Sequence, residues 1–76
     1  MKVKFNSLID AINFSQFIDK NLTNSDVNII SGNICIDAKS ILGIANLDVT
    51  KTYNIEIIGS NEDYQLLKNY IITGGK

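Results

Sequence analysis

The spacing of hydrophobic residues changes repeatedly along the chain, from the period of a strand to that of a helix and back. Alternation of apolar and polar residues predicts strands over residues 1–5, 26–31, 34–37 and 53–57. The pair Gly32-Asn33 separates the second and third strands and predicts a tight hairpin turn. The length of 76 residues suits a single domain, and no linker, repeat or proline interrupts it, so we expect one compact domain over 1–76.

Helical spacing predicts a first amphipathic helix from Ser7 to about Leu22 and a last helix over 61–72. Ser7 and Asp10 are the predicted capping residues of the first helix, and Ser60 and Asp63 those of the last. Between them, residues 41–45 are apolar but too few for a long helix. We expect one or two turns there, with Ser40 as the N-cap.

The order strand, helix, strand, strand, short helix, strand, helix favours an α+β fold with a four-stranded antiparallel sheet covered on one face by the helices. On the first helix, Leu8, Ile12 and Phe17 belong to the predicted inner, apolar face. In the second strand of the hairpin, Ile34 and Ile36 point inward and Cys35 faces the other side. Tyr64 lies on the predicted inner face of the last helix. The predicted core contains Val3, Phe5, Phe14, Ile18, Val27, Ile29, Ile36, Ile55, Ile57, Leu67 and Ile71.

Composition argues against several classes of function. Seven scattered lysines against eight acidic residues give a net charge of -1 without a basic patch, so we do not expect nucleic-acid binding. The chain has one cysteine, Cys35, and no histidine, which leaves neither a zinc site nor a Cys/His nucleophile; we expect no metal and no cofactor. No apolar run suits a signal peptide or a membrane span, so we expect a soluble, cytoplasmic protein.

The run DVNIISGNICIDAKSILGIANLDV, over residues 26–49, resembles the HPr family of bacterial phosphocarrier proteins. Within it Lys39-Ser40-Ile41-Leu42-Gly43 is similar to the family's K-S-I-M/L-G motif. The resemblance implies an HPr-like open-faced sandwich of order βαββαβα. Asp48 and Thr52 stand where the family commonly has glycine, which leaves the shape of that loop open.

The first helix departs from the resembled family, whose G-x-H-A-R-P-A motif carries the phosphate-accepting histidine. Asp10 stands in the place of that histidine, Ile12 in that of the arginine and Asn13 in that of the proline. We therefore do not expect an enzyme or a carrier of phosphate on histidine. A carboxylate can form an acyl phosphate, so a phosphocarrier that uses Asp10 is the alternative; a role for Asp10 at the helix start is the simpler interpretation.

Ser40 matches the serine that many Gram-positive family members present to a regulatory kinase, but it is also a sufficient helix cap. The resemblance implies a regulatory, protein-binding domain whose partners are phosphotransferase-system components, HPr kinase or a transcriptional regulator. A protein-contact module unrelated to sugar transport is the other interpretation. The predicted partner-binding residues are Asp10, Asn13, Phe14, Ser40, Ile41 and Leu42.

Overall fold

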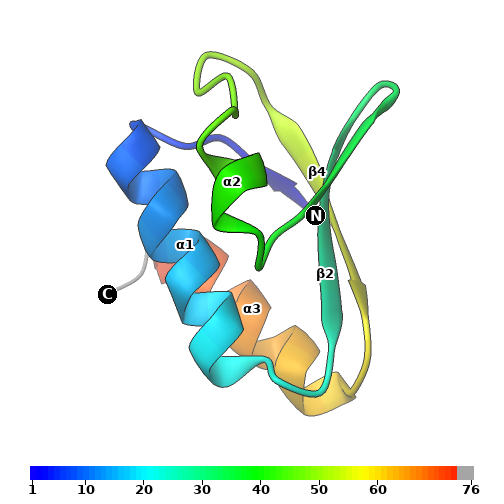
Figure 1. Ribbon diagram of the computed structural model, residues 1–76. Coiled ribbons are helices and arrows are strands. Elements are labelled where there is room, and N and C mark those ends of the chain that lie inside the picture. The colour runs from blue at the N-terminus through cyan, green and yellow to red at the C-terminus, as the bar shows by residue number, and fades with distance from the viewer. Residues whose placement is uncertain (74–76) are drawn as a thin grey trace.

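The computed structural model describes residues 1–73 as an α+β sandwich with one open face. Its elements in order are β1 (Lys2–Val3), α1 (Leu8–Asn21), β2 (Asp26–Ser31), β3 (Ile34–Asp37), α2 (Ile41–Ile44), β4 (Tyr53–Ile58) and α3 (Asn61–Thr73). The strands form one sheet in the order β1-β4-β2-β3, with every neighbouring pair antiparallel. The helices lie on one side of this sheet (Figure 1). The fold class predicted from the sequence is confirmed.

The register of the sheet separates its two faces. Ile29 pairs with Ile55 of β4 on one side and with Ile36 of β3 on the other, so these three side chains point toward the helices. Alternation along β4 places Asn54, Glu56 and Ile58 on the opposite, open face. An antiparallel sheet tolerates this arrangement, because its outer face can be hydrated.

The hairpin between β2 and β3 has the two-residue loop predicted from Gly32-Asn33. Ser31 pairs with Ile34 across the turn, and Gly32 has φ of 57°. A positive φ at the first central residue followed by a negative one fits a type II′ turn, which matches the twist of paired strands. Ile34 shares the face of Ile36 by alternation but is 50 % exposed and not part of the core, because it begins an edge strand. Cys35 is exposed, as expected.

The predicted caps are present at the helix starts. The Ser7 hydroxyl accepts a hydrogen bond from the Asp10 N–H at 3.1 Å, and the Ser60 hydroxyl accepts one from the Asp63 N–H at 3.1 Å. Each bond satisfies one backbone donor that the first helical turn leaves without a partner.

The core lies between the sheet and the helices. Its buried members are Phe5, Ala11, Phe14, Ile18, Leu22, Val27, Ile29, Ala38, Ile44, Leu47, Tyr53, Ile55 and Leu67. Of the predicted core residues, Val3, Ile36, Ile57 and Ile71 are only partly buried and pack at its edge. Leu8 and Tyr64 are exposed, which corrects their assignment to inner helix faces; each lies in the first turn of its helix.

Candidate functional site

Ser40 and Gly43 fix the geometry of α2. The Ser40 hydroxyl accepts a hydrogen bond from the Gly43 N–H at 3.3 Å, and the Ser40 carbonyl accepts one from the Ile44 N–H at 2.9 Å. A Cβ on Gly43 would come within 2.6 Å of the Cγ2 of Ile36, so glycine lets α2 approach β3 closely. Ser40 is therefore the N-cap, and its side chain is half-buried.

The apolar residues of α2 divide between core and solvent. Ile44 is completely buried, whereas Ile41 is 50 % and Leu42 79 % exposed. One helical turn has a single face toward the sheet, so it cannot bury all three side chains. Of the predicted partner-binding residues, Ile41 and Leu42 therefore lie at the surface.

Asp10 is part of the N-terminal cap of α1. Its Oδ2 accepts a hydrogen bond from the Asn6 N–H at 3.1 Å, while its own N–H donates to Ser7. This reciprocal arrangement has the character of a capping box, and the carboxylate also lies favourably at the positive end of the helix dipole. These contacts match the simpler interpretation of Asp10 as a helix-start residue.

Phe14 does not lie on the surface, which corrects its place in the predicted partner-binding set. It is 1 % exposed and packs edge-on against Phe5, with the ring centroids 5.2 Å apart. Tyr70 of α3 covers it from another side at 5.7 Å. Asn13, one position earlier, is exposed and remains available.

Two apolar residues at the start of α1 are exposed although the sequence did not predict it. Ile9 is 71 % exposed and Leu8 40 % exposed. The signal was present for Ile9, because it is two residues from Ala11 and so falls on the opposite side of a helix from the buried stripe. We call Leu8, Ile9, Ile41 and Leu42 the α1–α2 apolar set, because the two helices that carry them are in contact (Figure 1).

The loop after α2 takes its shape from polar contacts rather than from glycine. Asp48 Oδ1 accepts hydrogen bonds from the Thr50 hydroxyl at 2.5 Å and from the Thr50 N–H at 2.9 Å. The Asp48 N–H donates to the hydroxyl of buried Tyr53 at 3.1 Å. The hydrogen bonds from Thr50 lower the pKa of the Asp48 carboxyl, and Lys51 adds a smaller electrostatic contribution.

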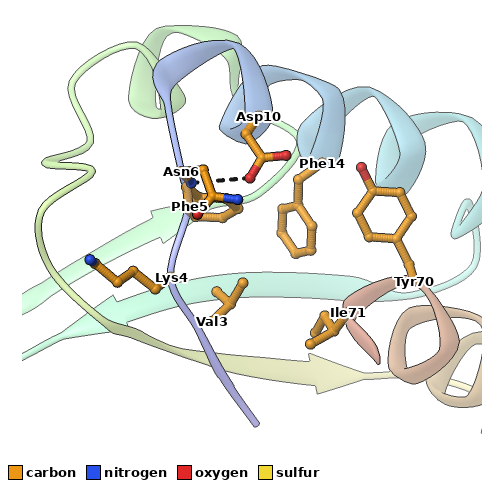
Figure 2. Close-up of a pocket in the computed structure, with 8 residues that line it drawn as sticks. All are labelled: Val3, Lys4, Phe5, Asn6, Asp10, Phe14, Tyr70 and Ile71. Carbon is orange, nitrogen blue, oxygen red and sulfur yellow. Dashed lines mark hydrogen bonds between the residues drawn. The ribbon is translucent and has the colours of Figure 1, made fainter. Parts of the chain in front are cut away.

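A pocket of about 200 Å³ opens where β1, the start of α1 and the end of α3 meet (Figure 2). Its apolar lining comes from Val3, Phe5, Phe14 and Ile71, and its polar lining from Lys4, Asn6, Asp10 and Tyr70. Burial raises the pKa of the Tyr70 hydroxyl, and the Asp10 carboxylate raises it further. At neutral pH the tyrosine is therefore an uncharged hydrogen-bonding group.

Within residues 1–73 the structure contains no group of three or more His, Cys, Asp or Glu side chains that could hold a metal ion. In the same part of the chain, no helix has the length and hydrophobicity needed to span a membrane. No family model, curated protein or solved structure matches the chain.

Proposed function

We propose that this chain is an HPr-like regulatory domain that acts in the cytoplasm by binding proteins of the phosphoenolpyruvate-dependent sugar phosphotransferase system. The observation that carries the proposal is the α1–α2 apolar set: four apolar side chains exposed on two helices in contact, beside a serine that caps one of them. An exposed apolar group of this kind suits the hydrophobic centre of a protein interface.

The βαββαβα order supports the proposal, because it is the architecture that the resembled family uses. The KSILG segment supports the proposal as well, because each of three residues has a distinct role. Ser40 caps α2, Ile41 is an exposed apolar residue, and Gly43 allows α2 to approach β3 closely. A fold alone does not determine a function, so the proposal depends on this site and not on the topology.

Phosphate transfer on Asp10 is the weaker alternative. Its carboxylate is already engaged by the Asn6 N–H, and the chain contains no arginine to stabilise a phosphoryl group. Incubation with the phosphoenolpyruvate-dependent loading enzyme tests this alternative. We expect an unchanged intact mass, and stoichiometric labelling would establish a phosphocarrier instead.

Incubation with an HPr kinase and ATP, followed by intact-mass measurement, tests the regulatory branch of the proposal. We expect one added phosphoryl group in the parent chain and none in Ser40→Ala, with Ser31→Ala as a control that keeps the modification. A phosphate at the N-terminus of α2 would be electrostatically favourable, because the helix dipole and free N–H groups attract anions. Failure of the parent chain to react would leave Ser40 as a cap and favour a module unrelated to sugar transport.

A further inference from the structure

The pocket beside α1 is separate from the α1–α2 apolar set and offers a different chemistry. Figure 2 shows the Asp10 carboxylate at its rim, with the Tyr70 hydroxyl directed toward the same opening and the Phe14 ring below them. The Lys4 side chain extends away from Asp10 in the same view. The cavity therefore combines a carboxylate and a hydroxyl above an apolar floor.

Aromatic packing holds Tyr70 at the pocket. Tyr70 stacks on Phe17 with ring centroids 4.3 Å apart and an interplanar angle of 24°, and it also contacts Phe14. Asp10 is fixed by its hydrogen bond from Asn6, which uses Oδ2. A carboxylate can accept several hydrogen bonds, so the engaged Asp10 retains capacity for another donor.

We propose that this pocket binds an ammonium group on a short apolar stem. The Asp10 carboxylate acts as the counter-ion, the Tyr70 hydroxyl accepts a hydrogen bond, and the stem lies against Val3 and Ile71. An aromatic ring near the cation adds a favourable electrostatic interaction. The volume of about 200 Å³ suits a ligand the size of a substituted benzene ring, since an apolar cavity of about 150 Å³ in another protein accommodates benzene.

Three probes that share one ring and differ in charge test the proposal: benzylamine, benzyl alcohol and benzoate. In titrations followed by amide nuclear magnetic resonance shifts of the ¹⁵N-labelled chain, we expect benzylamine to bind and to shift Asn6, Asp10 and Tyr70. Benzyl alcohol should bind about fivefold more weakly, which corresponds to the gain from one solvent-accessible ion pair. Benzoate should bind more weakly still, because Asp10 repels it.

Matched variants separate the pocket from general surface charge. Asp10→Asn keeps an oxygen for the helix cap but removes the charge, and we expect it to weaken benzylamine binding about fivefold. Asp19→Asn removes an exposed charge elsewhere on α1 and should leave binding unchanged. Tyr70→Phe keeps the ring packing and tests the hydroxyl alone.

An ammonium of this kind can belong to a free amine or to a lysine side chain of a protein. Nα-acetyl-lysine methylamide serves as the second arm of the titration: tighter binding of benzylamine identifies a free amine as the ligand, and tighter binding of the blocked lysine identifies a protein. The proposal is overturned if benzyl alcohol or benzoate binds as tightly as benzylamine, or if Asp10→Asn and Asp19→Asn have equal effects.

Discussion

The hydroxyl of Ser25 donates a 2.6 Å hydrogen bond to the carboxylate of Asp63, and both residues are buried. This bond joins the loop before β2 to the first turn of α3. The Lys39 ammonium donates a hydrogen bond to the Ser25 carbonyl at 2.9 Å, so the loop before α2 is linked to the same residue. Gly59 completes the junction, because a Cβ there would come within 2.8 Å of the Ser25 Cα.

Asp63→Ala should destabilise the protein, because the buried Ser25 hydroxyl loses its acceptor. Leaving a buried hydrogen-bonding group without a partner costs about 1–3 kcal/mol. Urea denaturation measures the free energy of unfolding, and Glu62→Ala is the control, since Glu62 is exposed in the same helical turn. Equal losses in the two variants would show that only the charge at the helix start contributes.

Gly43→Ala should also destabilise the protein, although alanine is the better helix former. The added methyl group would collide with Ile36, and overpacking of this kind typically costs about 1–3 kcal/mol against a gain in helix propensity of about 1 kcal/mol. A double-mutant cycle with Ile36→Ala checks the cause, because the smaller side chain removes the collision. Additive losses would mean that Ile36 is not the obstacle.

Thr50→Ala should raise the pKa of Asp48 toward its ordinary value of 3.8, because it removes the largest contribution that lowers it. A carboxyl whose pKa is lowered by folding stabilises the protein above pH ~3.8 and loses that contribution as the pH falls through the folded-state pKa. The variant should therefore show a smaller stability loss from this group on acidification. Carboxyl ¹³C shifts give the pKa directly, and an unchanged value would contradict the assignment to Thr50.

Ser40 substitutions should distinguish its structural role from its regulatory one. Ser40→Ala should lose about 1 kcal/mol of stability, because the Gly43 N–H loses its acceptor, whereas Ser40→Asp keeps a capping oxygen and should remain close to the parent. Thermal unfolding compares the three chains. If Ser40→Asp is as unstable as Ser40→Ala, the carboxylate does not replace the hydroxyl as a cap, and Ser40→Asp cannot be used as a folded mimic of the charged state.

Sequence periodicity was sufficient to predict the hairpin, because the turn residues Gly32-Asn33 mark the boundary between β2 and β3. The predicted bounds, 26–31 and 34–37, match the structure. It overestimated β1, predicted over 1–5 and observed as Lys2–Val3. Alternation indicates which side chains are buried, but it does not show how many residues have a partner strand. Phe5 is buried by packing on Phe14, not by sheet pairing with β4.

The candidate site was only partly predictable, because local spacing does not show how distant segments pack together. Ile41 and Leu42 were predicted as partner-binding residues, and both are exposed, because a four-residue helix cannot bury every apolar residue. Phe14 was predicted both as a core residue and as a partner-binding residue. Its spacing from Ala11 and Ile18 puts it on the buried stripe, so only the core prediction is confirmed. The pocket joins residues far apart in the sequence, and its formation depends on how the end of α3 docks beside β1.

If the α1–α2 apolar set is a protein-binding face, a charge within it should abolish partner binding, whereas a charge on the open face of the sheet should not. Leu42→Glu and Ile58→Glu each place a charge on an apolar residue, 79 % and 60 % exposed respectively, but on opposite sides of the molecule. The measurement is quantitative mass spectrometry of proteins retained from cell extract by immobilised parent and variant chains. We predict that proteins retained by the parent and by Ile58→Glu are lost by Leu42→Glu; retention by Leu42→Glu together with loss by Ile58→Glu would contradict the claim and place the interaction on the open face of the sheet.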